Sequence, residues 1–239
     1  MIQKHPNLFL IGFPKSGTTA LASELASHSD IYMPIKEPRF YDRFIYYDFE
    51  SDYRISSFDD YLAIYKDWNI GTYALDASNF IVYDIEQIKQ IKRRKCNAKF
   101  ILVLRDPIEA SISMHSQRLK YQDLHMREIS SNFEDCWKLI NERKIGKGFP
   151  NNVRNKFLFQ YDALFNYVQY VPKVLEFLQT ELLIIDYAQY KNDPATIHRR
   201  IQTFLELDYQ VLQRIKVNQS YTAKANFVSR WIKAAKKRG

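Results

Sequence analysis

The amino-acid sequence predicts an α/β fold in which a central, mainly parallel sheet is flanked by helices. Apolar runs typical of strands in a parallel sheet occur at residues 8–12, 99–104 and 182–187. A helical pattern follows each run, and strands that alternate with helices indicate a parallel α/β architecture. Two of the junctions also carry groups suited to holding an anion. In open parallel sheets, ligands bind at the carboxyl ends of the strands.

Length and composition indicate one large domain. The chain has 239 residues, 46% of them hydrophobic, which is enough for one sizeable core. We therefore expect residues 1–239 to form a single domain. No apolar run approaches the length that crosses a bilayer, and the N-terminal stretch lacks the pattern of a signal peptide. These features predict a soluble, cytoplasmic protein without a membrane span.

Charge and cysteine content narrow the class of partner only in part. The formal net charge is +8, which suits an anionic ligand but does not distinguish a nucleotide, an acidic glycan and nucleic acid. The two cysteines, Cys96 and Cys136, are too few for a disulfide framework or a metal site. Two ordinary buried thiols in a reducing compartment are the simpler interpretation.

The junction after the first strand predicts a phosphate-binding loop. Gly12 and Gly17 punctuate the loop between the strand at 8–12 and a helix at 20–25, and both let the backbone approach a ligand closely. The first amides of a helix lack internal partners and lie at the positive end of the helix dipole, so they attract an anion. The residues expected to contact the anion are Lys15, Ser16, Gly17, Thr18 and Thr19.

The spacing of this loop resembles that of a Walker A loop, G-x-x-x-x-G-K-[ST], with one displacement. Thr18 stands where the Walker lysine belongs, and the lysine has moved to position 15. A lysine at position 15 would lie beside the group that leaves from the 5′ end of a bound nucleotide. A tight turn with an incidental lysine is the alternative for the loop taken alone.

The strand at 99–104 ends in a second candidate anion site. Asp106 is a suitable N-cap and Pro107 a suitable first residue for a helix over 107–120. Arg105 and Ser113, two turns into that helix, can converge on one dianion through charge-assisted hydrogen bonds. The alternative is an arginine–aspartate cap with a serine bonded to its own helix backbone. Two such junctions in this order make coincidence a weak explanation.

A short segment between two prolines carries a candidate catalytic carboxylate. Pro34 and Pro38 flank Lys36 and Glu37, stiffen the segment and keep it out of a helix. A stiff loop that holds a carboxylate beside a lysine can support general base catalysis. Without the neighbouring motifs, Glu37 would be interpreted as a solvated carboxylate paired with Lys36.

Together these motifs resemble those of sulfotransferases that use 3′-phosphoadenosine 5′-phosphosulfate (PAPS). The Pro-Lys-Ser-Gly-Thr-Thr hexad at 14–19 is similar to the 5′-phosphosulfate loop of the family, and residues 104–113 to its 3′-phosphate site. Residues 36–42 are similar to the Lys-Glu-Pro-His-Phe-Phe-Asp stretch of heparan sulfate and related bacterial carbohydrate sulfotransferases. The resemblance spans residues 8–207 and implies a P-loop-like α/β domain.

The resemblance also implies an activity and residue roles. Glu37 would be the general base, Lys15 would stabilise the departing phosphate, and Arg105 with Ser113 would hold the 3′-phosphate. The cofactor would be PAPS, with adenosine 3′,5′-bisphosphate (PAP) as the product, and no metal. The acceptor would be a hydroxyl or amine of a glycan or a small molecule, with no nucleic-acid partner. The sequence identifies neither the acceptor nor the oligomeric state.

Three departures from the family pattern stand out. Arg39 occupies the usual histidine position beside Glu37. The segment at 76–80 lacks the lysine and the proline that family members often carry. Residues 224–239 are basic but do not match the glycine-containing segment that usually closes over the nucleotide, so this tail is either divergent or shortened.

Two other classes of function remain open at this stage. The first is an ATP-dependent P-loop kinase, which Thr18 and the lack of a convincing Walker B acid disfavour. The second is a non-catalytic binder of acidic glycan or nucleic acid that uses the net positive charge.

The remaining segments carry weaker expectations. A strand is expected at 71–76, a helix at 79–94, and irregular structure at 121–150. A helix from 157 to 171 should end before Pro172, which a second helical piece follows, and another helix should span 195–205. The aromatic-rich stretch at 44–68 could pack on the core or stack on sugar rings, and packing is the commoner outcome. His115 and His125 are expected to be surface or helix-packing residues.

Overall fold

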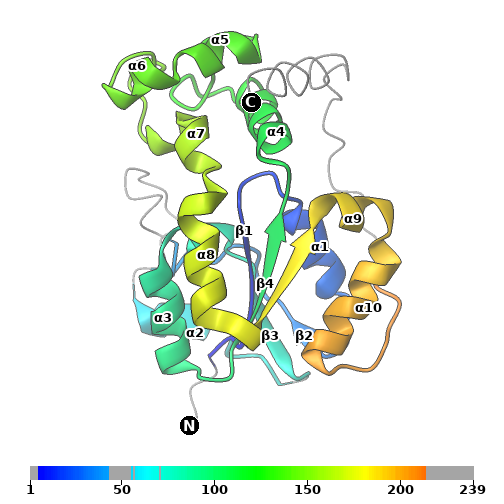
Figure 1. The fold of residues 1–239 in the computed structure, drawn as a ribbon. Helices are drawn as coiled ribbons and strands as arrows, with labels where there is room; N and C mark the ends of the chain where they lie inside the picture. The colour runs from blue at the N-terminus through cyan, green and yellow to red at the C-terminus, as the bar shows by residue number, and fades with distance from the viewer. Residues whose placement is uncertain (1–4, 43–54, 56, 70, 214–239) are drawn as a thin grey trace.

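A five-stranded parallel sheet forms the centre of the molecule (Figure 1). The computed structural model describes residues 5–42, 55, 57–69 and 71–213. The strands are β1 (Leu8–Gly12), β2 (Ile31–Tyr32), β3 (Tyr73–Asp76), β4 (Lys99–Leu104) and β5 (Leu182–Asp186). Their order is β2-β3-β1-β4-β5, and every neighbouring pair is parallel. The predicted α/β class with a mainly parallel sheet is confirmed.

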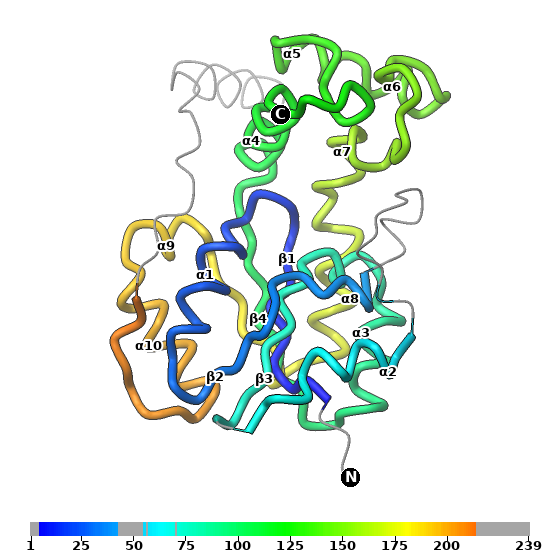
Figure 2. Tube along the Cα trace, turned by 180° about the vertical axis from the view of Figure 1, so that it is seen from behind, coloured from blue at the N-terminus to red at the C-terminus, as the bar shows by residue number. Residues whose placement is uncertain are grey.

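Helices cover both faces of this sheet and extend beyond its carboxyl edge. The α-helices are α1 (Thr18–Leu25), α2 (Phe58–Ala63), α3 (Ile85–Arg94), α4 (Pro107–Arg118), α5 (Phe133–Lys138), α6 (Ile140–Lys144), α7 (Tyr161–Leu164), α8 (Tyr167–Leu178), α9 (Tyr187–Asn192) and α10 (Pro194–Leu205). Short 3-10 helices are η2 (Asn79–Tyr83), η3 (Phe157–Phe159) and η4 (Gln179–Glu181). Figures 1 and 2 show α1, α9 and α10 on one face and α3 and α8 on the other, with α4 to α7 above the strand ends.

The alternation of side chains along β1 explains these two layers. Successive side chains of a strand point to opposite faces. Leu8 and Leu10 pack with the apolar side chains of α1 and α10, whereas Phe9 and Ile11 pack with those of α3 and α8. All of β1 is buried, because it lies in the middle of the sheet and is covered on both faces.

The order of the strands places β1 and β4 at a switch point. From β1 the chain continues to β2 and β3 on one side, then crosses to β4 and β5 on the other. The register pairs Leu8 with Lys99 and Gly12 with Val103. In open parallel sheets, ligands bind in the crevice where the strand order reverses. The two predicted anion junctions follow β1 and β4, so both leave the sheet at this crevice.

Several predicted boundaries in the first half of the chain were wrong for local reasons. Gly71 has a φ of +88°, so the chain turns there and β3 begins only at Tyr73. The helix expected at 79–94 is two elements, η2 and α3. Asp84 separates them, because its side chain accepts a hydrogen bond from the amide of Glu86 and caps α3.

Other corrections concern the second half. The segment 121–150, expected to be irregular, contains α5 and α6. Pro172 lies inside α8 and does not end it, because Val174 and Leu178 continue the buried face of that helix. The strand at the edge of the sheet, β5, buries only Ile185 fully, and the separate helix α9 before α10 was not predicted.

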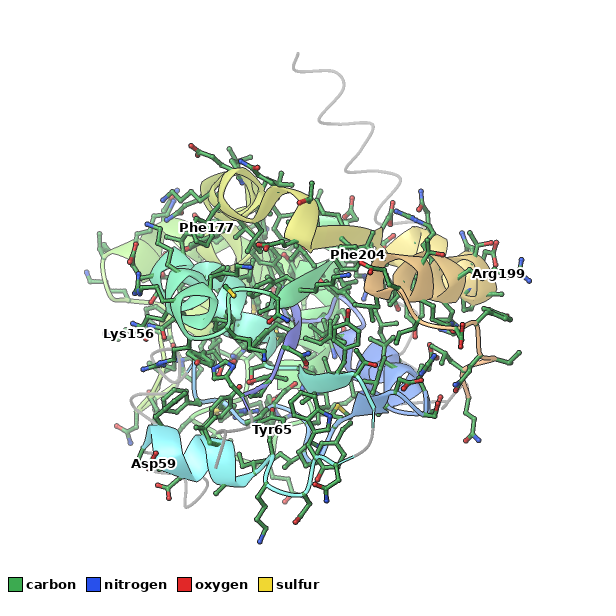
Figure 3. The ribbon with its side chains drawn as sticks, turned by 90° about the horizontal axis from the view of Figure 1, so that it is seen from below. Asp59, Tyr65, Lys156, Phe177, Arg199 and Phe204 are labelled. Carbon is green, nitrogen blue, oxygen red and sulfur yellow. The ribbon has the colours of Figure 1, made fainter. Side chains whose placement is uncertain are left out.

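The described part of the aromatic stretch packs on the core. Tyr61 and Tyr65 are fully buried, and the Tyr61 ring stacks on Phe40 with centroids 4.8 Å apart. Figure 3 shows Tyr65 toward the interior, whereas Asp59 lies on the outer side of α2. Residues 44–54, which include five of the nine aromatic residues of this stretch, and residues 224–239 lie outside the described residues.

A buried ion pair holds together the helices beyond the sheet. Arg143 donates two hydrogen bonds to Glu128, at 3.0 and 2.9 Å, and both side chains have no exposed surface. The Tyr161 hydroxyl donates a third bond to Glu128 at 2.6 Å. Burial raises the pKa of Glu128, but the bonds from Arg143 outweigh it and the pKa lies below its ordinary value. Glu128 is therefore ionised and fully partnered.

Replacement of Arg143 should destabilise the fold strongly. Arg143→Met leaves the Glu128 carboxylate buried without its cation, and breaking such a pair costs about 3–5 kcal/mol of unfolding free energy. Urea unfolding followed by circular dichroism measures this loss. Lys144→Met is the matched control, because Lys144 pairs with Asp162 at the surface with 56% of its side chain exposed. The control should lose about 1 kcal/mol or less, and equal losses in the two variants would contradict the prediction.

Candidate active site

The loop after β1 has the backbone of an anion-binding turn. Gly12 lies so close to β4 that a Cβ atom would be 2.8 Å from the carbonyl oxygen of Val103. Lys15 and Gly17 have positive φ angles of 65° and 85°, which turn the chain into the start of α1. The first helical residues, Thr18 and Thr19, follow at once, and Thr18 is buried. The first amides of α1 have no partner within the helix, so the loop keeps the features from which the anion site is predicted.

Two buried hydroxyls in this loop region make no well-formed hydrogen bond. Ser16 is completely buried, and its Oγ and the hydroxyl of Tyr167, from α8, lie close to each other but not in hydrogen-bond geometry within the described structure. Burial raises the pKa of Tyr167 to about 12, against the opposing influence of Ser16 and of the Arg105 backbone. Buried polar groups are normally hydrogen-bonded. These hydroxyls are consequently available to the oxygen atoms of a bound anion.

Arg105 lies against the same loop. Its guanidinium donates a hydrogen bond to the carbonyl oxygen of Lys15 at 3.0 Å and contacts Glu109 at 3.4 Å. Its Nε is buried and has no partner among the described residues. Lys15 and Arg105, 90 residues apart in the chain, therefore belong to one site and not to two faces of the molecule.

Tyr187, the first residue of α9, completes the wall of the site. Its ring lies under the guanidinium of Arg105, with the Arg105 Cζ 4.7 Å from the ring centroid. The same ring packs against Gly17, where a Cβ atom would be 2.5 Å from Cε2 of Tyr187. No local motif marks Tyr187 in the sequence, and it was not predicted as a site residue. Only its position directly after the strand β5 could have indicated that it faces the crevice.

Four cations gather around the loop. Burial lowers the pKa of Lys15 below its ordinary value, and the nearby charges of Arg105, Lys120 and Lys36 lower it further. Lys36 comes from the loop after β2 and Lys120 from the end of α4. Lys120 belongs to no motif and was not predicted as a site residue. This concentration of positive charge is suited to a ligand with several anionic groups.

Ser113 lies on α4, the helix that begins directly after Arg105 and Asp106. Asp106 caps this helix by accepting hydrogen bonds from the amides of Ile108 and Glu109, both at 2.9 Å. The neighbouring Ser111 and Ser116 donate to carbonyl oxygens four residues earlier. Ser113 makes no such bond among the described residues, so the alternative of a serine bonded to its own helix does not apply.

Glu37 is held between two cations. Its carboxylate accepts hydrogen bonds from Lys36 and from Arg39, the latter at 2.9 Å. Burial raises the pKa of Glu37, but Lys36 and Arg39 outweigh burial and the pKa lies below its ordinary value. The carboxylate is therefore ionised at neutral pH, as a proton acceptor must be.

The backbone of this segment is tied to the end of β3. The Arg39 amide donates to Oγ of Ser78 at 3.1 Å, and the Ser78 amide donates to Asp76 at 2.8 Å. Glu37 and Arg39 both have positive φ angles, 56° and 59°. Side chains rarely adopt this conformation, and it is disfavoured further for Glu37 because a proline follows. Such strain is concentrated at functional sites.

Two buried carboxyls face Glu37. Asp42 is fully buried, and its oxygens make no well-formed hydrogen bond among the described residues, although the Phe80 backbone acts to lower its pKa. Burial and the neighbouring Asp76 raise the pKa of Asp42 to about 8, and burial likewise raises the pKa of Asp76. Of the three carboxyls, Glu37 alone has a lowered pKa. The environment thus separates one ionised carboxylate from two acids that burial drives toward the neutral form.

The remaining candidates add no further site. His115 is buried on α4 with Nε2 2.9 Å from the Ser130 carbonyl, so it is a packing residue, whereas His125 contacts the Asn151 carbonyl nearer the surface. Within the described ranges, no group of three or more His, Cys, Asp or Glu side chains is arranged to hold a metal ion. Nor does any helix of these ranges combine the length and apolarity of a membrane span. Where the protein resides in the cell stays a prediction from the sequence.

These features define a class: a P-loop-like α/β protein with a candidate anion site at the switch point of its sheet. The family model for the sulfotransferase domain matches residues 5–236, and the chain belongs to this family. Over 214 residues, 84% of this chain, it is 26% identical to heparan sulfate glucosamine 3-O-sulfotransferase 3B1 of Mus musculus. The match covers 46% of that relative, so the chain spans about half its length.

Solved structures show the same fold. The crystal structure of a sulfotransferase from Alicyclobacillus acidocaldarius superposes with a TM-score of 0.73 at 21% identity, covering 96% of this chain and 92% of the other. Mouse sulfotransferase SULT7A1 complexed with PAP superposes with a TM-score of 0.54 at 16% identity, covering 87% of this chain and 60% of the other. The resemblance to sulfotransferases inferred from the motifs is confirmed at the level of the family.

Gly17→Ala should strain and crowd the loop. Alanine at this position must adopt a positive φ and place its methyl group against the Tyr187 ring, and such overpacking costs about 1–3 kcal/mol. Urea unfolding of the variant measures the loss. Gly146→Ala is the matched control: Gly146 has a φ of +84°, but a Cβ atom there would meet only Nζ of Lys156 at 3.9 Å. If both variants lose the same stability, Tyr187 does not constrain the loop.

Proposed function

We propose that this chain is a PAPS-dependent sulfotransferase that transfers a sulfuryl group to a hydroxyl or amine of a carbohydrate acceptor. We further propose that residues 1–239 act as one sulfotransferase domain. The observation that carries the proposal is the hydrogen bond from Arg105 to the Lys15 carbonyl at 3.0 Å. It brings the loop expected to hold a 5′-phosphosulfate next to the arginine expected to hold a 3′-phosphate.

The residues of the loop suit a nucleotide with phosphate groups at both ends. Ser16 Oγ and Arg105 Nε are buried without partners in the described structure, so both can bond to phosphate oxygens. Arginine provides the planar fork that phosphate favours. Ser113 is the hydroxyl that would share the 3′-phosphate with Arg105. The positive charge of Lys15 and the amides of residues 16–19 would surround the 5′ end.

The proposed reaction is an in-line displacement. PAPS supplies the sulfuryl group, a new bond forms between the acceptor oxygen or nitrogen and sulfur, and the bond from sulfur to the phosphate oxygen breaks. Glu37 takes the proton of the acceptor as that bond forms. Lys15 and the adjoining amides stabilise the negative charge that develops on the departing phosphate oxygen.

The carbohydrate acceptor rests on the named relative and on two residues. The mouse relative is a heparan sulfate glucosamine 3-O-sulfotransferase. The two residues are Lys36 and Glu37, which come from the segment that resembles the carbohydrate branch. Lys36 is one of the four cations around the loop, and it pairs with Glu37. A kinase is disfavoured because Thr18, the first residue of α1, stands where the Walker lysine would be.

Two substitutions should abolish most of the chemical step while leaving the fold intact. Lys15→Ala and Glu37→Gln should each lower kcat about a hundredfold or more, since the first removes charge stabilisation and the second removes the base. Steady-state rates with labelled PAPS and the acceptor found by a screen over glycans, lipids and phenols measure this. Lys89→Ala, on the exposed side of α3, is the control and should retain the wild-type rate. Glu37→Gln at the wild-type rate would remove Glu37 from the role of base.

Arg105→Ala should act chiefly on nucleotide binding. The variant loses a charge-assisted contact to the 3′-phosphate, so the Kd for PAP should rise about tenfold or more, and Ser113→Ala should have a smaller effect in the same direction. Calorimetric titration with PAP measures both. If the wild-type protein binds DNA with a steep salt dependence and shows no affinity for PAP, the proposed function is wrong and a non-catalytic binder is favoured.

A further inference from the structure

The two cations that pair with Glu37, Lys36 and Arg39, differ in their exposure to solvent. The side chain of Lys36 is 27% exposed and that of Glu37 19%, whereas that of Arg39 is 44% exposed. Arg39 is therefore the outer partner, and the one that a molecule approaching Glu37 meets first.

The backbone of Arg39 is held in place, so a change of partner at Glu37 would involve its side chain alone. Its amide is bonded to Ser78, which is bonded in turn to Asp76 at the end of β3. Pro38 precedes it, and its own φ is +59°. Release of Glu37 by Arg39 would need a rotation of the long side chain and no movement of the loop.

An anion on the acceptor can compete for this guanidinium. A solvent-exposed ion pair is weak, because water screens the charges and the long side chains lose rotamer freedom. A second carboxylate or a sulfate can therefore replace Glu37 as the partner of Arg39, or share its fork of five donors. The cluster of Lys15, Lys36 and Lys120 next to the segment attracts the same anion.

Loss of one cation makes Glu37 a stronger base. Among the groups that face it, Lys36 and Arg39 lower the pKa of Glu37, and together they outweigh the burial that raises it. Asp42 and Asp76 interact with Glu37 as like charges when ionised, which acts in the upward direction. When Arg39 turns away, Lys36 alone opposes burial. Proton abstraction becomes easier as the pKa of the base rises toward that of the acceptor group.

We propose that Arg39 is a specificity-determining gate on the base. Its guanidinium restrains Glu37 in the free enzyme, and a carboxylate or sulfate on the acceptor draws it away, so that anionic acceptors meet a stronger base than neutral ones. This inference rests on the proposed sulfuryl transfer with Glu37 as base. Arg39 acts through Glu37 and through the acceptor anion, and takes no proton itself.

The first test compares two acceptors that differ only in the group at C6, with sulfation scored at the ring hydroxyls that both share. p-Nitrophenyl glucuronide carries a carboxylate where p-nitrophenyl glucoside carries a hydroxymethyl group. Arg39→Gln should raise kcat for the neutral glucoside, because the base is no longer restrained. It should also raise KM for the glucuronide, so that the preference for the anionic acceptor falls about tenfold or more in kcat/KM. Arg39→Lys keeps a cation and should retain most of the preference.

The control for loss of charge is Arg199→Gln. Arg199 is exposed on α10, and Figure 3 shows it at the outer edge of the molecule. This substitution should leave kcat and KM unchanged for both acceptors. Unfolding midpoints of all variants in urea show whether each is folded. The gate is overturned if Arg39→Gln lowers kcat for the glucoside and leaves the preference for the glucuronide in kcat/KM unchanged.

The second test does not depend on turnover. Carbon-13 NMR of the glutamate carboxyls, with PAP bound and Glu37 assigned from the Glu37→Gln spectrum, reports the pKa of Glu37 directly. In the wild type, saturating methyl glucuronide should raise the pKa of Glu37, whereas methyl glucoside should not. In Arg39→Gln, neither compound should raise this pKa. If PAP binds but methyl glucuronide does not raise the pKa of Glu37, the gate is overturned and the proposed function is not affected. Failure to bind PAP overturns the proposed function instead, so the two failures are distinguishable.

Discussion

The pairing of β1 with β4 is the constraint on which the candidate site depends. The two strands align over five residue pairs, from Leu8 with Lys99 to Gly12 with Val103. Because they are parallel and in register, both chains leave the sheet at the same edge. The loop that contains Lys15 and the turn that contains Arg105 therefore meet, and the guanidinium reaches the loop carbonyl. The tight approach at Gly12 leaves no room for a side chain there.

Elements distant in sequence complete this arrangement. Tyr187 from α9 supports both Gly17 and the Arg105 guanidinium. Tyr167 from α8 places a second buried hydroxyl near Ser16. The loop thus packs against a strand and two helices, and the Ser16 hydroxyl and Arg105 Nε are buried there without a well-formed hydrogen bond in the described structure. Donors held in place in this way suit an anion, because little reorganisation would be needed when a ligand binds.

The distribution of charge divides the site into two parts. Around the loop, burial and mutual repulsion destabilise the protonated form of Lys15, and an incoming polyanion relieves that repulsion. Around the segment at 36–42, two cations keep Glu37 ionised, while burial raises the pKa of Asp42 to about 8. One carboxylate is therefore available as a proton acceptor beside a pocket of positive potential. Lys36 links these two parts, because it pairs with Glu37 and its charge also lowers the pKa of Lys15.

The sequence by itself determined the features that local chemistry encodes. Apolar periodicity gave the α/β class, glycines marked the loop, and the Asp106–Pro107 pair located the start of α4, because each depends on neighbours a few residues away. The same local patterns placed Lys15, Glu37, Arg105 and Ser113 as candidates. They did not reveal Asp84 as the cap that divides the helix expected at 79–94.

Only the tertiary structure decided which side chains meet in space. Tyr187, Lys120 and Tyr167 reach the loop from positions more than a hundred residues along the chain, and no periodicity or motif encodes such contacts. The pKa directions of Glu37 and Asp42 likewise depend on burial and on charges brought close by the packed sheet and its loops. Sequence chemistry is local, whereas the electrostatics of a site is set by everything that folding places around it.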